Sequence, residues 1–273
     1  YNVVVGDEAG TALTTGDNNV LMGYAAGDAL TTSVRNTAVG TEALSSATTG
    51  DNNTAIGFKA LFTNVDGDRN VAVGVGSLQT FEPSAGDTYN VAVGFDAGNK
   101  ITTGIQNTLI GGLAGDALTT GSNNTAVGAQ GALGADTLGS RAIAIGDAAL
   151  QSQNFTTATE NYNVAVGYAA GANVSTGVQN TLIGGLAGDA LTDADFNTAV
   201  GVSSLAADTL GSRSTAVGWG ALQAQNFTTA TDVYNVAVGN MAGTAITTGT
   251  SNTLIGGLAG DALTTGAANV ALG

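Results

Sequence analysis

Two pairs of aspartates are the side chains whose type and spacing could do chemistry. Asp66 and Asp68 lie two residues apart, as do Asp193 and Asp195. Carboxylates at such spacing are typical of calcium ligands or, when they face each other across a cleft, of glycoside hydrolysis. Neither pair continues into an EF-hand loop, and nothing in the sequence singles out one pair as a catalytic centre. We therefore expect no enzyme and no cofactor, with calcium the one bound ligand left open.

The rest of the composition excludes most other chemistry. The 273 residues include no histidine and no cysteine, which excludes a Cys/His zinc site, a Ser-His-Asp triad and a disulfide framework. With 21 acidic and 6 basic residues, the net charge is −15, so we expect no binding to nucleic acid or to an anionic membrane. No apolar run is long enough for a membrane-spanning helix. The first residues contain neither an initiator methionine nor a basic leader region, so we expect a fragment of a longer chain.

A five-residue motif recurs along the whole chain and decides the fold. It consists of Asn, then Thr or Val, then Ala or Leu, then Val or Ile, and finally Gly. Its sixteen copies end between Gly6 and Gly273, mostly 17 residues apart. That period is too short for pairs of helices, and short β-branched segments between Gly and Asn are typical of strands. The sequence therefore predicts an all-β fold, a parallel β-solenoid of about 16 coils of 17 residues, as one repetitive segment over 1–273.

The motif also predicts which residues each coil encloses. The second and fourth positions share one face of a strand, and we expect them to fill the coil. A second segment, which begins three residues after the motif glycine and carries leucines such as Leu44 and Leu61, should face the same core. The third position then points outward although it is apolar, usually alanine but leucine at Leu21, Leu109, Leu182 and Leu254. Because an exposed strand face is normally polar, these four leucines predict an oligomer interface with other copies of the chain, arranged with cyclic symmetry.

Asparagine occupies the first motif position in all copies but two, where Ala142 and Ser214 replace it. Identical asparagines stacked in parallel coils can hydrogen-bond along the stack. We interpret them as a structural ladder at a corner of the coil, with a ligand-binding row as the alternative. The ladder consists of Asn2, Asn19, Asn36, Asn53, Asn70, Asn90, Asn107, Asn124, Asn163, Asn180, Asn197, Asn235, Asn252 and Asn269.

Three insertions interrupt the 17-residue spacing, at 79–88, 151–161 and 223–233. Each carries one phenylalanine, namely Phe81, Phe155 or Phe227. Loops on rigid scaffolds often bind partners, so these three rings are candidate surface contacts. The alternative is that each ring folds back over a coil edge.

Part of the motif has a family likeness. The segments Asn36–Leu44 and Asn53–Leu61 read Asn-Thr-Ala-Val/Ile-Gly followed by x-x-Ala-Leu. This pattern resembles the head repeat of YadA-like trimeric autotransporter adhesins, and it resembles still more closely the repeats of bacteriophage tail fibres. The resemblance implies a left-handed β-roll wound as an intertwined or bundled homotrimer. It departs from the adhesins in its longer repeat and in the lack of their neck and stalk.

The resemblance implies a structural or adhesive fibre segment, a shaft or head that projects a receptor-binding region from a phage tail or a cell surface. The partners would be other copies of the chain and a glycan or protein of the host surface. A bacterial trimeric adhesin and an extracellular filament protein that binds calcium remain alternatives. A more remote alternative is an ice-binding solenoid that uses the threonines of the Thr-Thr-Gly segments, such as 102–104 and 119–121.

Overall fold

The computed structural model describes residues 1–84 and 86–273. The insertion at 79–88 therefore includes one position, residue 85, outside the described residues. The chain divides into two compact units, Tyr1–Ser140 with Thr156–Ala158, and Arg141–Phe155 with Thr159–Gly273. Both are all-β, and no helix that could cross a membrane occurs among the described residues. The predicted parallel β-solenoid of about 16 coils is confirmed.

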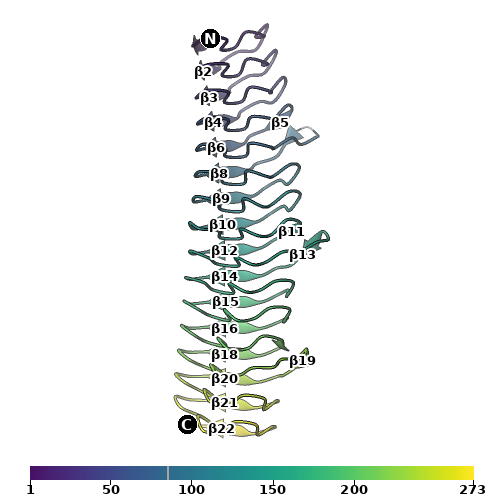
Figure 1. Cartoon of the computed structure of the whole chain (residues 1–273). Coiled ribbons are helices and arrows are strands. Elements are labelled where there is room, and N and C mark those ends of the chain that lie inside the picture. Colours follow the sequence, from purple (N-terminus) through teal and green to yellow (C-terminus); the bar gives the residue numbers. More distant parts are fainter. Residues whose placement is uncertain (85) are drawn as a thin grey trace. The chain divides into compact units, whose positions relative to one another are not determined.

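In the first unit, a three-residue strand forms at each copy of the motif, and each strand pairs in parallel with the next along the chain (Figure 1). These strands are β1 (Val3–Val5), β2 (Val20–Met22), β3 (Thr37–Val39), β4 (Thr54–Ile56), β6 (Val71–Val73), β8 (Val91–Val93), β9 (Thr108–Ile110) and β10 (Thr125–Val127). Three two-residue strands lie elsewhere on the coils: β5 (Gly67–Asp68), β7 (Gly86–Asp87) and β11 (Gly139–Ser140). Strands β5 and β7 pair in parallel beside the first insertion.

The second unit repeats this arrangement. Its motif strands are β12 (Ile143–Ile145), β14 (Val164–Val166), β15 (Thr181–Ile183), β16 (Thr198–Val200), β18 (Thr215–Val217), β20 (Val236–Val238), β21 (Thr253–Ile255) and β22 (Val270–Leu272). Its short strands are β13 (Thr159–Glu160), β17 (Gly211–Ser212) and β19 (Thr231–Asp232), and β17 pairs in parallel with β19.

Each motif residue pairs with the same motif position of the next coil. In β15 and β16, for example, Thr181 lies opposite Thr198 and Leu182 opposite Ala199. Backbone hydrogen bonds join the rest of the coils in the same way, as from Gly188 N to Ser204 O across 2.9 Å. This register gives every motif position its own continuous row within a unit.

The interior of the coil is the reverse of what the motif predicted. The third position is fully buried in β2–β10 and in β12–β21, whereas the second and fourth positions are partly or fully exposed. Leu21, Leu109, Leu182 and Leu254 are each 0% exposed in the single chain. They pack inside their own coil, so their assignment to an interface between copies is wrong.

The third position faces inward because the coil has a narrow interior and because side chains alternate between the two faces of a strand. The ladder asparagines from Asn19 to Asn252 are buried, and the third position shares their side of the strand. The second core-facing segment was predicted correctly, and Leu44, Leu61 and their equivalents are fully buried. In some coils the side-chain volumes at these two core positions are complementary. Leu109 faces Gly115, whereas the smaller Ala38 shares its coil with the larger Leu44. A Cβ added to Gly115 would lie 2.8 Å from Leu109 Cδ2.

The motif glycine follows the strand at a place where two coils approach closely. Gly184 has φ of 131°, and a Cβ there would lie 2.6 Å from both the carbonyl carbon and the oxygen of Gly201. A side chain at this position would meet backbone that cannot move without breaking the stack.

Candidate functional site

The largest candidate site is the outward side of the motif strands, here called the outer strand face. It consists of the second and fourth motif positions, with the residue before each motif and the residue after it as the two borders. In the fourth coil, Asn52, Thr54, Ile56 and Phe58 point outward while Asn53 and Ala55 are buried. The central rows carry Val, Ile and Thr, so this face is largely apolar. Apolar surface that runs over many coils marks an interaction site.

Exposed aromatic residues gather on the two borders of the outer strand face. On the border before the motif, they are Tyr89, Tyr162, Phe196 and Tyr234. On the border after the motif, they are Tyr24, Phe58, Phe95, Tyr168 and Trp219. Such half-exposed rings are typical of interfaces, where they supply a large contact area at small entropic cost.

Arginine, an acid and a tyrosine form the same cluster beside each insertion. In the second unit, Arg141 Nε lies 3.0 Å from Glu160 Oε1, and Tyr162 donates to Glu160 Oε2 across 2.7 Å. The guanidinium also lies 5.7 Å from the Tyr162 ring centroid. The Tyr162 hydrogen bond and the neighbouring Arg141 lower the pKa of Glu160, so this exposed carboxylate is ionised at neutral pH.

The other two clusters have matching partners. Arg69 contacts Asp87 and donates to Tyr89 across 2.9 Å. Arg213 Nε lies 2.9 Å from Asp232 Oδ1, and its guanidinium lies between two rings, 4.7 Å from Phe196 and 5.9 Å from Tyr234. These clusters were not predicted from the sequence. The available signal was that four of the six basic residues stand directly before the motif, namely Arg35, Arg69, Arg141 and Arg213.

The insertion phenylalanines are not surface contacts. Phe81 is 0%, Phe155 5% and Phe227 7% exposed. Each ring folds back into its own chain, because burial of an aromatic ring outweighs the cost of ordering a short loop. The exposed aromatic residue beside each insertion is instead the tyrosine of the cluster: Tyr89, Tyr162 or Tyr234.

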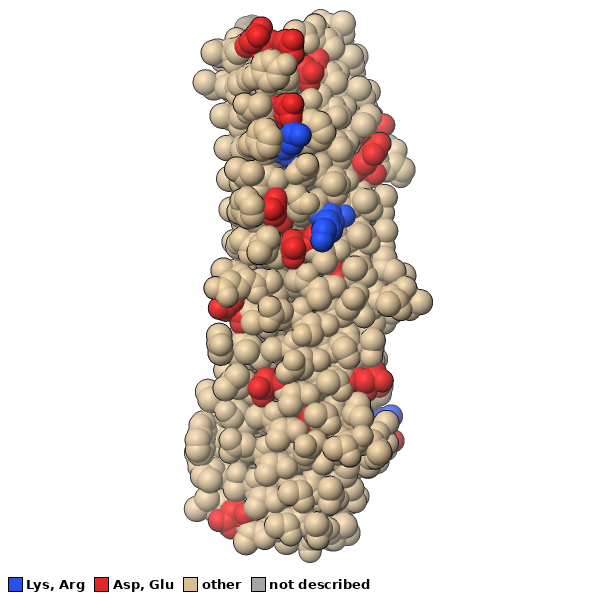
Figure 2. Space-filling view, in the orientation of Figure 1, with Lys and Arg blue, Asp and Glu red and all other residues tan. Residues whose placement is uncertain are grey.

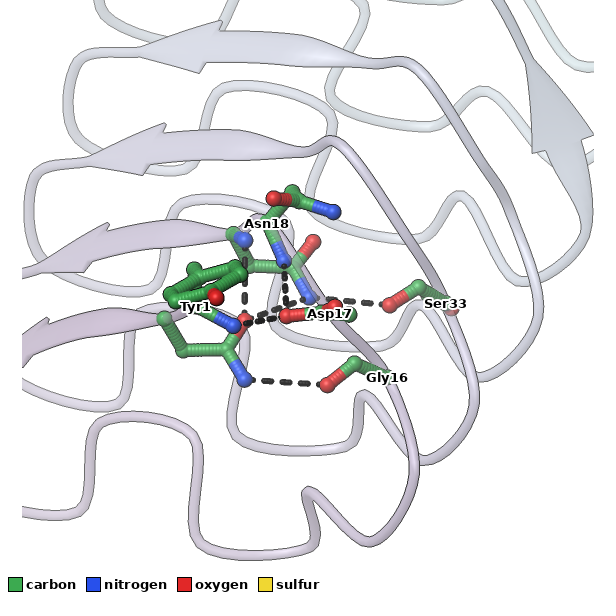
Figure 3. Close-up of polar contacts among 7 residues, drawn as sticks. Tyr1, Gly16, Asp17, Asn18 and Ser33 are labelled. Carbon is green, nitrogen blue, oxygen red and sulfur yellow. Dashed lines mark hydrogen bonds and ion pairs between the residues drawn. The ribbon is translucent and has the colours of Figure 1, made fainter.

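The motif asparagines form a hydrogen-bonded ladder inside the coils. Asn180 Oδ1 accepts from the backbone N–H of Asn197 across 2.9 Å, and Asn180 Nδ2 donates to Ala194 O across 2.8 Å. The first contacts of the ladder reach Gly16 O and Ser33 O (Figure 3). Because both ends of each buried amide are used within the chain, the asparagines are not available to a ligand.

Glutamine takes over where the ladder lacks an asparagine. In the coil of Ser214, the buried Gln225 donates from Nε2 to Ser214 Oγ and to Asp208 Oδ2, and it accepts from Asn235 Nδ2. In the coil of Ala142, Gln153 Oε1 accepts from Asn163 Nδ2 across 2.8 Å. The insertion coil that keeps its asparagine, Asn70, has Phe81 in the place of the glutamine.

The paired acids bond to the preceding coil rather than to each other. Asp68 Oδ1 accepts from Asp51 N, and Asp195 Oδ1 accepts from Val178 N across 2.7 Å. Asp66 and Asp193 accept from threonine hydroxyls of the preceding coil. Among residues 1–84 and 86–273, no group of three or more acids could hold a metal ion.

Repeated single acids occupy partly buried positions after the motif. Burial raises the pKa of Asp116 and of Asp189 above the usual range. One carboxylate oxygen of Asp189 is buried without a hydrogen-bond partner. Charged side chains are sparse on the side of the molecule drawn in Figure 2.

No family model, no curated protein and no solved structure matches this chain.

Proposed function

We propose that the chain is a structural and adhesive fibre segment, part of a phage tail fibre, that holds a receptor-binding region away from the virion. The observation that carries this proposal is the outer strand face, which is apolar, bordered by aromatic rings and exposed in the single chain. Its repetition coil after coil suits lengthwise contact with other copies. The resemblance to tail-fibre and adhesin repeats supports the same function, with a bacterial trimeric surface adhesin or filament protein as the alternative.

In this proposal each copy is a left-handed β-roll, and the copies form a homotrimer through the outer strand face. The covered surface is the row of second and fourth motif positions, in place of the third position that the sequence suggested. Burying such rows stabilises by about 25 cal/mol per Å² of apolar surface. A host glycan or protein would then contact the sides that remain exposed in the bundle, where the insertions lie.

The mass in solution tests the proposal. Light scattering should give three times the chain mass of 26.5 kDa. The variant Ile183→Lys places a charge on the outer strand face and should yield folded monomers, whereas Asn173→Lys, an exposed position outside this face, should keep the oligomer. A folded monomer of the unaltered chain would contradict the proposal.

The ice-binding alternative has less support. The first threonine of the Thr-Thr-Gly segments uses its hydroxyl within the chain, as where Thr102 Oγ1 donates to Thr119 O and Thr119 Oγ1 to Thr137 O. These hydroxyls are therefore not free to order water. Thermal hysteresis in a solution of the chain would favour this alternative over the fibre.

A further inference from the structure

In a few motifs of the second unit, the two borders of the outer strand face carry residues that could pair with each other. In the ninth motif, Arg141 precedes and Asp147 follows; in the thirteenth, Arg213 precedes and Trp219 follows. Aromatic residues stand on both borders at Tyr162 and Tyr168. An ion pair and an aromatic pair are thus each divided between opposite edges of one coil.

A single chain cannot make these contacts. The two border residues are six positions apart and lie on either side of an extended strand, up to about 20 Å from each other. Among the residues that the structure describes, the ion pair of Arg141 is with Glu160, and none joins it to Asp147. Arg141 still has donors available, because a guanidinium carries five N–H groups and the bond to Glu160 uses Nε.

We propose that copies of this chain associate side by side, parallel and in register, so that the border before each motif meets the border after the same motif in a second copy. This inference deepens the proposed function, on which it rests. Such a contact joins two different edges and is heterologous, so it closes into a ring when the rotation allows it. Every copy then offers Arg141 to one neighbour and Asp147 to the other.

The in-register alignment of neighbouring copies is inferred from the contacts that a shift by one coil would remove. Within the second unit, a shift by one coil in one direction would place Arg141 beside Tyr168, and a shift in the other direction would place Asp147 beside Tyr162. The ion pair would be lost in either direction. In register, no motif carries like charges on both borders, and mismatched charges at an interface would cost several kcal/mol.

Cysteine cross-linking of the full chain tests the inference, because the chain has no cysteine of its own. The double variant Tyr162→Cys/Tyr168→Cys, treated with a short bis-maleimide, should give a covalent product with the mass of the whole oligomer on a denaturing gel. The single variants Tyr162→Cys and Tyr168→Cys should each remain uncrosslinked, and an assembly refolded from a mixture of the two should yield covalent dimers. The control Tyr162→Cys/Trp219→Cys pairs positions three coils apart and should yield no product.

Each other outcome overturns the inference. Cross-linking of a single variant to itself would show a two-fold contact between identical edges, and equal cross-linking of the displaced control would show an unfixed register. An oligomer by light scattering without cross-links in the double variant would overturn the edge pairing but leave the proposed function intact. A monomer would overturn both, and circular dichroism of each variant verifies that it is folded.

Discussion

The Gln225 amide lies between Ser214 and Asn235, donating to Ser214 Oγ and accepting from Asn235 Nδ2, each across 2.9 Å. It thereby bridges a gap in a ladder that asparagine otherwise fills. The bridge ties the insertion at 223–233 to the core, because its glutamine is part of the buried network. This part of the insertion is therefore structural.

Removing this bridge should destabilise the second unit. Gln225→Leu leaves the buried carboxylate of Asp208 without its Nε2 donor, which should lower the free energy of unfolding by about 1–3 kcal/mol. The triple variant Asp208→Asn/Ser214→Asn/Gln225→Phe copies Asn64, Asn70 and Phe81 of the first insertion coil. It should recover most of the loss in a urea titration. A triple variant less stable than Gln225→Leu would show that the two solutions are not interchangeable.

Exchanging a leucine and a glycine inside one coil tests the inverted core. Leu109→Ala should cost about 2–5 kcal/mol, and Gly115→Leu alone should clash with Leu109. Because a side chain at Gly115 would also meet Leu118, the triple variant Leu109→Ala/Gly115→Leu/Leu118→Ala restores the arrangement of Ala38, Leu44 and Ala47, where leucine already has a φ of 54°. Its melting temperature should approach that of the unaltered chain. If Leu109→Ala left stability unchanged but altered the oligomer, leucine would belong to an interface after all.

The adjacent glycines Gly184 and Gly185 differ sharply in the room that each leaves for a side chain. A Cβ at Gly184 would lie 2.6 Å from backbone atoms of Gly201, whereas the nearest atom to a Cβ at Gly185 is 4.0 Å away. Gly184→Ala should therefore prevent soluble expression or lower the melting temperature severely, and Gly185→Ala should have little effect. Similar melting curves for both variants would argue against close stacking at the motif glycine.

Truncating a ladder asparagine should cost more than truncating one on the surface. Asn180→Ala leaves the backbone N–H of Asn197 and the carbonyl of Ala194 without their partners. Each buried unpaired group costs about 1–3 kcal/mol. Asn173→Ala removes an exposed hydrogen bond and should change stability by less than about 0.5 kcal/mol. Chemical denaturation of the two variants measures the difference.

Neutralising Asp189 should stabilise the chain at neutral pH. Burial raises the pKa of Asp189 above its usual 3.8, so the unfolded chain binds fewer protons than the folded one between these two pKa values. Stability therefore falls as pH rises through that window, and Asp189→Asn should raise the melting temperature at pH 7 by about 1–2 °C. The gain should vanish below the usual aspartate pKa, where both states are protonated. Asp261→Asn, at the equivalent but exposed position, serves as the control and should show no gain.

The period of the motif was sufficient to predict the parallel coils and the second core segment, because both depend only on spacing and on the leucines at regular positions. The face of the motif strand that turns toward the core was mispredicted. Val and Ile are more apolar than Ala, and hydrophobicity alone placed them inside. The buried asparagine settles the matter, since Asn180 and Leu182 share one side of their strand and are both 0% exposed.

The clusters beside the insertions could not be predicted from the sequence, for a different reason. Arg141 and Glu160 are 19 positions apart in the chain, and their contact depends on where the insertion returns to the stack. A regular repeat does not specify that path. The same uncertainty applied to Phe155 and Phe227, whose burial depends on how each loop closes.

Each coil offers its successor the same donors and acceptors that it received from its predecessor. The nearly identical stretches at 181–192 and 253–264 lie 72 residues apart, so recombination between them at the gene level would add or delete four coils without creating an unmatched junction. Chain length is thus a trait that evolution can tune in discrete steps, and related strains are expected to differ in how many such blocks they carry.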